Sequence, residues 1–172
     1  MLISKNLTAA LNEQIGYEFF TSMQYTAIAC YFGAEALPEL AKHFTLQAEE
    51  ERTHALKLVN YVVDSGGKMI IPTIPSPQSD FKTAEEACKL ALDSELEVTK
   101  KINGLVDLAI EEKDHLAQNF LQWFVNEQLE EVSTAETLLR IVQRAGEAGL
   151  LFVEDYLARN GLAASTPDLN AQ

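Results

Sequence analysis

The chain has 172 residues, of which 47% are hydrophobic and 23% charged, and its formal net charge is −13. This composition suffices for one well-filled core, so we expect one domain over residues 1–160 and a flexible tail over residues 161–172. The acidic excess argues against a nucleic-acid partner and favours cations. No stretch has the length and apolarity of a signal peptide or a membrane span, so we expect a cytoplasmic protein with no membrane partner.

Apolar residues that recur every 3.5 to 3.6 positions predict four long helices and one short helix, with most glycine and proline at the joints. In chain order the helices are expected over residues 5–32, 38–65, 83–112, 115–145 and 148–159. Ser4 and Asp114 are the expected N-caps of the first and fourth helices. Pro38 suits the first turn of the second helix, which should end before Gly66.

The connection over residues 66–82 contains three prolines and is predicted to be extended. A segment of this length can travel along a whole helix of about 28 residues, roughly 42 Å. The second and third helices can therefore be parallel, whereas the short joints make the other neighbours antiparallel. The predicted fold is all-α, a four-helix bundle with one long crossover and a short fifth helix. Met69, Ile70 and Ile71 should place the crossover against a surface, such as that of a neighbouring subunit.

The two cysteines, Cys30 and Cys88, lie far apart within helical patterns. They form neither a metal-binding CxxC pair nor a disulfide framework. We therefore expect two buried, reduced thiols.

The inner face of each long helix is apolar at its ends and polar in its middle. The polar residues lie within a few positions of the helix midpoints, so they share one level of the bundle: Glu18, Glu51, His54, Glu95, Gln128 and Glu131. No lysine or arginine occupies a central position on these faces. The sequence therefore supplies no obvious countercharge for the carboxylates.

Four ionised carboxylates in a core of low dielectric constant must take up protons or bind cations. Two divalent metals would balance four glutamates, and a neutral His54 would complete the ligand set. Mixed oxygen and nitrogen ligands suit iron or manganese, although zinc would also bind. The pattern predicts a dinuclear metal site. The alternative is a structural bundle whose acidic groups are neutralised in another way.

The ligand pattern repeats within the chain. A shift of 77 residues maps the first set onto the second: Glu18, Glu51 and His54 onto Glu95, Gln128 and Glu131. The Glu-x-x-His of the first half becomes Gln-x-x-Glu in the second, whereas ferritin-like di-iron bundles carry Glu-x-x-His twice. The two metal positions are therefore predicted to be unequal, one with a histidine and one with oxygen ligands alone.

Six stretches within about residues 6–160 resemble the non-haem bacterial ferritins, the type also labelled bacterioferritin B: LNEQIGYEF, QYTAIACYF, LPELAKHF, AEEERTHA, QWFVNEQLEEV and RAGEAGLLFVEDYLAR. The resemblance implies a ferritin-like bundle with a di-iron centre. Glu18, Glu51 and His54 would hold the first iron, with Glu51 bridging. The second would be held by Glu95 and Glu131, with Gln128 nearby.

Further site residues follow from the same resemblance. Tyr25 would be a redox-active neighbour of the centre, the alternative being a buried aromatic that happens to be adjacent. A third iron site toward an inner cavity is implied for Glu50, Glu127, Glu130 and Glu131, the alternative being an acidic solvated helix face. Trp123 is expected to be a core residue first and an electron donor second. His43 and His115 are assigned no chemistry.

The implied function is iron storage with ferroxidase activity, using O2 or H2O2, in a cytoplasmic homo-oligomeric shell of twenty-four subunits. Haem is not expected, because Arg52 follows Glu51 where haem bacterioferritins carry methionine. The fifth helix separates the chain from the mini-ferritins, and the absence of a four-cysteine module separates it from rubrerythrins. The rival interpretation is a di-iron or di-manganese peroxidase or catalase-like oxidoreductase that retains its metals.

Overall fold

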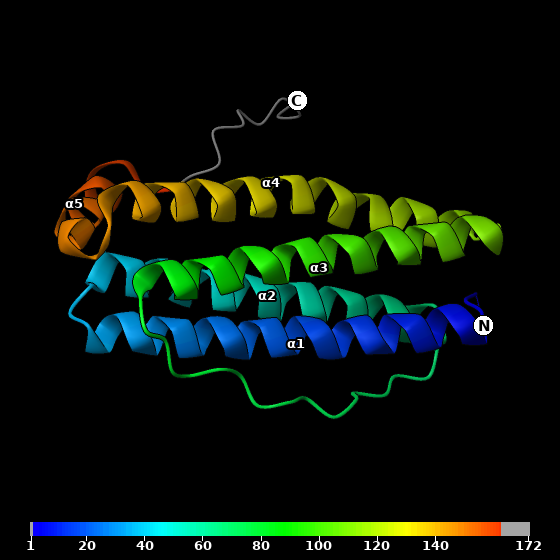
Figure 1. Ribbon diagram of the computed structural model, residues 1–172. Helices are drawn as coiled ribbons and strands as arrows, with labels where there is room; N and C mark the ends of the chain where they lie inside the picture. Colours follow the sequence, from blue (N-terminus) through cyan, green and yellow to red (C-terminus); the bar gives the residue numbers. More distant parts are fainter. Residues whose placement is uncertain (1, 163–172) are drawn as a thin grey trace.

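The computed structural model describes residues 2–162, and these residues form helices and loops without a strand. The elements are α1 Lys5–Ala34, α2 Pro38–Asp64, α3 Ala84–Glu111, α4 His115–Ala145, the short 3-10 helix η1 Glu147–Gly149 and α5 Leu150–Asn160 (Figure 1). The four long helices begin and end within two residues of the predicted positions. The fifth helix, α5, also begins and ends within two residues of its predicted positions, and the 3-10 turn η1 precedes it. Most of the predicted tail, residues 163–172, lies outside the described residues.

The helix starts have the capping contacts that the sequence predicts. The Ser4 side chain accepts a hydrogen bond from the Leu7 amide at 3.0 Å. The Asp114 carboxylate accepts one from the Ala117 amide at 2.9 Å. These side chains satisfy amides that have no partner within the first turn, and so they fix where α1 and α4 begin.

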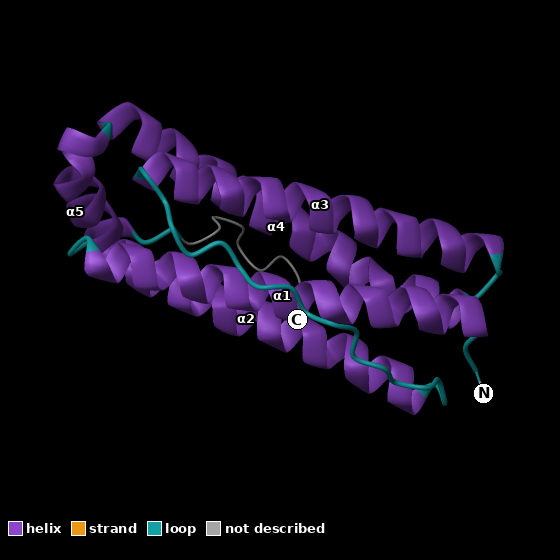
Figure 2. Cartoon of the chain, turned by 60° about the horizontal axis from the view of Figure 1, so that its bottom comes forward, coloured by secondary structure: helices purple, strands orange, loops and turns teal. Residues whose placement is uncertain are grey.

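The bundle has the predicted topology. Helices α1 and α2 are antiparallel, as are α3 and α4, and the crossover returns the chain so that α2 and α3 run in the same direction (Figure 1). The crossover lies along α1 (Figure 2). Asn12 donates to the Lys68 carbonyl at 2.9 Å and accepts from the Ile70 amide at 3.2 Å. Gln24 makes the same pair of bonds with the Gln78 backbone, at 2.7 and 2.8 Å.

Close contact between the crossover and α1 requires a glycine. A Cβ atom at Gly16 would lie 2.2 Å from Pro72 Cγ, so a larger residue there would displace the crossover. Met69 packs on the core, whereas Ile70 and Ile71 are more than half exposed, at 52% and 56%. Contact of these two isoleucines with a neighbouring subunit stays a prediction.

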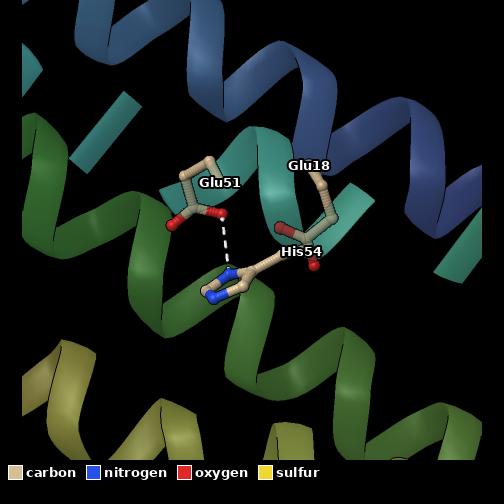
Figure 3. Close-up of side chains that lie close together, drawn as sticks. All are labelled: Glu18, Glu51 and His54. Carbon is tan, nitrogen blue, oxygen red and sulfur yellow. Dashed lines mark ion pairs between the residues drawn. The ribbon is translucent and has the colours of Figure 1, made fainter. Parts of the chain in front are cut away.

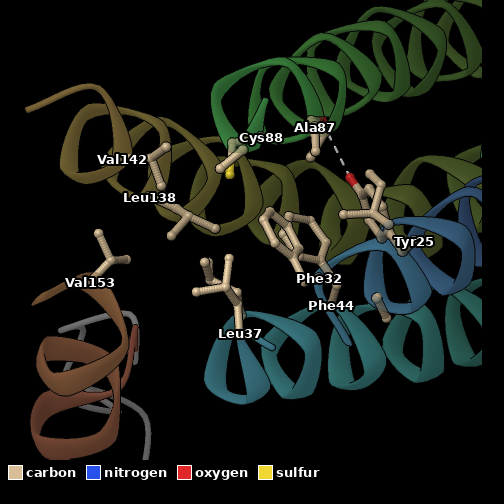
Figure 4. Packing of buried hydrophobic residues seen from close by; sticks show 14 of the residues in the cluster. Tyr25, Phe32, Leu37, Phe44, Ala87, Cys88, Leu138, Val142 and Val153 are labelled. Carbon is tan, nitrogen blue, oxygen red and sulfur yellow. Dashed lines mark hydrogen bonds between the residues drawn. The ribbon is translucent and has the colours of Figure 1, made fainter. Parts of the chain in front are cut away.

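Two apolar clusters fill the bundle, one toward each end. The cluster near α5 contains Phe32, Phe44 and Leu138 (Figure 4), and the other contains Leu11 and Leu121. Each long helix contributes to both clusters, and its polar midpoint residues lie between the two contributions. The core is therefore divided by a polar layer at one level.

The two cysteines differ in burial. Cys88 is buried, but Cys30 is exposed, so the prediction of two buried thiols was wrong for Cys30. Cys30 lies on the outer side of α1. The small and apolar residues around it in the sequence do not by themselves mean that it is buried.

Across residues 2–162 no helix combines the length and the apolarity that a membrane crossing requires.

Candidate metal centre

The four long helices direct six predicted ligand residues into the polar layer. All six are at most 5% exposed: Glu18, Glu51, His54, Glu95, Gln128 and Glu131. Within residues 2–162 none of them forms an ion pair with a lysine or arginine. The layer thus holds four buried carboxyl groups without a basic partner.

The first predicted metal position is assembled. Glu18, Glu51 and His54 each offer one ligand atom, and these atoms lie within 4.8 Å of one another (Figure 3). Glu51 Oε2 is 3.4 Å from His54 Nδ1. Glu18 Oε2 and Glu51 Oε2 are buried and have no hydrogen-bond partner. A buried oxygen without a partner is costly, and a cation held by the three side chains would satisfy both oxygens.

Glu95 in the second position is held by neighbouring side chains. Gln128 Nε2 donates to Glu95 Oε2 at 3.1 Å and to Thr99 Oγ1 at 3.2 Å. The Tyr25 hydroxyl donates to Glu95 Oε1. Glu131 is the other predicted ligand of this position. One of its ligand atoms lies within 4.8 Å of ligand atoms of His54 and Glu127 instead. The second position is therefore less fully assembled than the first.

Burial controls the protonation of the layer. It raises the pKa of Glu18 to about 7 and that of Glu131 to about 9, and it raises the pKa of Glu51 well above the usual range. Burial and the Lys57 ammonium lower the pKa of His54 to about 4, so this imidazole is neutral at pH 7. Carboxyl groups that hold protons in the metal-free protein will release them when a cation binds.

Tyr25 is 1% exposed and contacts the centre through Glu95. Burial, followed by the Glu95 and Glu51 carboxylates, raises the pKa of this phenol well above 10, so the hydroxyl keeps its proton. The hydrogen bond links the Tyr25 ring to a predicted metal ligand. Its redox role stays a prediction, because an orienting contact alone would use the same bond.

An open groove of about 660 Å³ lies between α2 and α4 beside the polar layer. All four residues predicted for a third site border it: Glu50, Glu127, Glu130 and Glu131. Glu50 and Glu130 are exposed, whereas Glu131 is buried. A compact ligand set in the groove consists of His54, Glu127 and Glu131, with ligand atoms within 4.8 Å of one another. The sequence did not predict His54 in such a set.

Trp123 is not a core residue, which corrects the first expectation for it. It is 36% exposed and lines the groove. Its ring lies 5.4 Å from the His54 ring, nearly perpendicular to it at 77°. Lys57 Nζ lies 3.7 Å above the indole, where cation–π attraction holds it. Trp123 thus packs against a predicted metal ligand from the groove side.

Sequence reasoning assigned no role to two residues that contact the site. Gln14 Nε2 donates to Glu18 Oε1 at 2.8 Å and orients that carboxylate. Its position four residues before Glu18 places both on one helix face, and this spacing was the available signal. Lys57 follows His54 by three residues, which gives the same kind of signal on α2.

Comparison with known proteins agrees with this geometry. A profile of the Ferritin-like domain matches residues 8–145. Ferritin BfrB of Mycolicibacterium smegmatis is 47% identical over 156 residues, which cover 91% of this chain and 86% of the relative. Bacterial non-heme ferritin of Staphylococcus aureus is 36% identical over 167 residues, which cover 97% of this chain and 99% of the relative.

Solved structures with the same fold are also ferritins. A novel open pore ferritin from the archaeon Archaeoglobus fulgidus superposes with a TM-score of 0.88 and 33% identity, over 91% of this chain and 97% of the other. The profile covers most of the bundle, and the relatives extend over nearly the whole chain. Four helices that carry a buried layer of carboxyl groups around His54, together with these matches, establish that the chain belongs to the ferritin family.

Proposed function

We propose that this chain stores iron and acts as a ferroxidase, oxidising Fe(II) to Fe(III) with O2 or H2O2 as the oxidant. The names of the relatives, all ferritins, support iron as the substrate. The observation that carries the proposal is the pair of buried, partnerless oxygens, Glu18 Oε2 and Glu51 Oε2, beside a neutral His54. A divalent cation bound by these three side chains together would displace the protons that the carboxyl groups hold in the metal-free protein.

The residues have distinct roles in this proposal. Glu18, Glu51 and His54 hold the first Fe(II), and Glu51 bridges to the second. Glu95 and Glu131 hold the second Fe(II), with Gln128 beside it. Gln14, Gln128 and Tyr25 keep the carboxylates oriented through the hydrogen bonds described above. The histidine gives the two positions different affinities, so that one iron leaves more easily than the other.

Holding two irons together supplies two electrons in one step. Two Fe(II) ions give two electrons to O2, which takes up two protons and leaves as hydrogen peroxide. With hydrogen peroxide as the oxidant, two electrons and two protons yield two water molecules. Carboxyl groups whose pKa is raised by burial release protons when Fe(II) binds, and these protons are available at the site.

The exit route is proposed to be the groove between α2 and α4. Glu50, Glu127, Glu130 and Glu131 would hold a third iron there, on its way to a ferric mineral. Their common position on the groove wall supports this role. The alternative, an acidic face that only contacts solvent, predicts no metal affinity at Glu127.

Assembly into a hollow shell of twenty-four copies, a cytoplasmic location and the absence of haem are parts of the same proposal. The rival is an oxidoreductase that retains two metals and need not form a shell. Native mass and elemental analysis after aerobic loading with Fe(II) separate the two. We expect a shell that contains far more iron than two atoms per chain. A small oligomer with two firmly held metals per chain would favour the rival.

A further inference from the structure

A small, largely enclosed cavity lies beside Tyr25, in the apolar cluster on the α5 side of the polar layer. Its volume is about 10 Å³, which is room for one molecule of about the size of water. Each of the four long helices contributes to its wall. The wall consists mainly of aromatic, aliphatic and small side chains, four of which are labelled in Figure 4: Tyr25, Phe44, Cys88 and Leu138, with Ala91 and Ala135 beside them.

The wall of the cavity is uncharged at pH 7. Burial raises the pKa of the Cys88 thiol to about 12, so the thiol keeps its proton. His43 also borders the cavity, and burial lowers the pKa of its imidazole to about 4, so the ring is neutral. Within residues 2–162 neither a carboxylate nor a basic group with a charge borders this space. The cavity therefore suits an uncharged molecule and not a metal ion.

Two hydrogen-bond donors of the wall are engaged with groups outside the cavity. The Tyr25 hydroxyl donates to Glu95 Oε1 in the polar layer. Gln47 Nε2 donates to Glu50 Oε2 at 2.5 Å, on the side of the groove. A buried water needs about three hydrogen-bond partners, so a wall of this kind holds water poorly. Dry apolar cavities in proteins instead take up small apolar molecules.

The cavity lies between the groove and the second predicted metal position. His43 and Gln47 border both the cavity and the groove, so the two spaces approach each other at these side chains. Tyr25 borders the cavity and is hydrogen-bonded to Glu95, the predicted ligand of the second iron. A small molecule that passes His43 from the groove therefore comes within one side chain of the metal centre.

We propose that this cavity is a holding site for dioxygen, which enters from the groove past His43 and is held beside Tyr25, next to the second iron position. The inference rests on the proposed function, because it assigns a place to one of the two oxidants named there. Dioxygen is small, uncharged and apolar, as the wall requires, whereas hydrogen peroxide needs hydrogen-bond partners. The carboxylates proposed to hold departing iron border the groove and not the cavity, so the two routes use different side chains.

Dissolved O2 tests the site in the absence of iron. Because O2 is paramagnetic, it speeds the NMR relaxation of methyl groups near the place where it resides. In the metal-free full-length protein with labelled alanine methyl groups, the Ala91 signal should relax severalfold faster under O2 pressure than under N2. Ala117 is the matched control, since both residues are buried, at 4% and 0% exposure, but Ala117 does not border the cavity.

Filling the cavity should affect the two oxidants differently. Ala135→Leu extends a side chain into the space from α4, and Ala91→Val does so from α3 with a smaller addition in case the first variant folds poorly. Either should raise the KM for O2 severalfold and leave kcat at saturating O2 nearly unchanged. Fe(II) oxidation by H2O2 should keep the wild-type rate. Thr137→Leu is the control, because Thr137 is exposed on α4 and does not border the cavity.

Two results would overturn the holding site. One is an Ala91 signal that relaxes under O2 no faster than that of Ala117. The other is an equal loss of rate with O2 and with H2O2 in Ala135→Leu and Ala91→Val, which would mean that the substitutions only disturb the metal centre. The proposed function fails separately, if the unchanged chain oxidises Fe(II) no faster than buffer does with either oxidant. The relaxation measurement on the metal-free protein does not depend on that outcome.

Discussion

Gln128 Nε2 lies 3.1 Å from Glu95 Oε2, at the position where the internal repeat places the counterpart of Glu51. The first half of the chain thus offers a carboxylate at this position, and the second half offers an amide that donates to a neighbouring carboxylate. An amide brings no negative charge and directs a donor at Glu95. The two halves are therefore chemically unequal where the repeat would make them equal.

This inequality predicts different effects of substitutions in the two halves. Glu51→Ala should nearly abolish rapid paired oxidation, because it removes the proposed bridge. His54→Ala should mainly empty the first position, and Glu95→Ala the second, which leaves single irons that oxidise slowly. Stopped-flow measurement of Fe(II) oxidation at two Fe(II) per chain would show these differences.

The groove residues supply the comparison for this series. Glu130→Ala should keep the initial fast phase and alter later turnover, because Glu130 is exposed on the groove wall and lies beyond the proposed pair. Wild-type fast kinetics in Glu51→Ala would rule out the bridging role.

The metal-free protein should gain or keep stability when one buried acid is removed. Glu51 and Glu18 lie close together in the polar layer, and their burial is unfavourable without a cation. Glu51→Gln should therefore leave the apo free energy of unfolding unchanged or raise it. Leu58→Ala, in the packed core of the same helix, should lower it by about 2–5 kcal/mol. Thermal melts with a chelator compare the two. A loss at Glu51 as large as that at Leu58 would contradict a metal-binding role.

The polar layer could be predicted from the sequence because it depends on helix phase alone. Residues such as Glu51 and Glu95 lie on the same faces as apolar residues three and four positions away, and the helix midpoints place them at one level. The distance between two helices is not contained in such a pattern. The approach of Glu127 to His54 depends on how far apart α2 and α4 lie at the groove. The sequence therefore did not predict that His54, Glu127 and Glu131 form one ligand set.

Trp123 shows a second limit. It precedes Phe124, a buried member of the inner face, and a step of one residue turns about 100° around a helix. Such a neighbour lies at the edge of the face, where burial depends on the adjacent helix. Here that neighbour is α2, and the groove leaves the indole 36% exposed. The large aromatic side chain favoured a core position in the prediction. The open groove beside α4 leaves Trp123 partly exposed instead.

The stability of the metal-free protein should fall as the pH rises from about 4.5 to 9. Burial raises the pKa of Glu18 from 4.5 to about 7 and that of Glu131 from 4.5 to about 9. In this range the folded chain binds more protons than the unfolded chain, so each pH step favours unfolding. The contribution is fully present below pH 4.5 and is lost as the pH passes the folded values. Thermal melts with a chelator measure the slope.

Glu131→Gln provides the control, since it should flatten the upper part of this slope. Zn(II) binding should show the opposite trend, because the cation displaces the same protons, and its apparent affinity should rise between pH 6.5 and 9. A metal-free protein that becomes more stable over this range would contradict protonated carboxyl groups in the layer.

Haem should not bind at the position that follows Glu51. Arg52 is exposed and carries a charged guanidinium where an axial thioether would be needed. Reconstitution with haem should give no stoichiometric Soret band at one haem per two chains. Arg52→Met is the informative variant, since haem uptake by that variant alone would trace the exclusion to this residue. A tight complex with the unchanged chain would mean that another residue serves as the ligand.

The C-terminal helices have a structural role inside the chain, because they supply N-caps to two of the long helices. Glu154 of α5 accepts hydrogen bonds from the Glu39 and Leu40 amides at 2.7 and 2.9 Å, which caps the start of α2. Glu147 of η1 accepts one from the Ala84 amide at 3.0 Å and caps α3. Carboxylates at helix N-termini are stabilising through these bonds and through the helix dipole. Glu154→Gln should therefore lower the free energy of unfolding by about 1–2 kcal/mol.

Truncation after Arg144 should weaken the shell, but it also removes both caps, so its effect has two causes. A double variant, Leu151→Ser with Phe152→Ser, separates them. These residues are 75% and 80% exposed in the single chain, whereas Val153 and Leu157 of the same helix are buried. If α5 packs at a subunit junction, the double variant should lose shell mass in native mass spectrometry while its monomer melts normally. Glu154→Gln should show the reverse, a less stable chain that still assembles. A double variant with full shell mass and normal mineral retention would remove Leu151 and Phe152 from the junction.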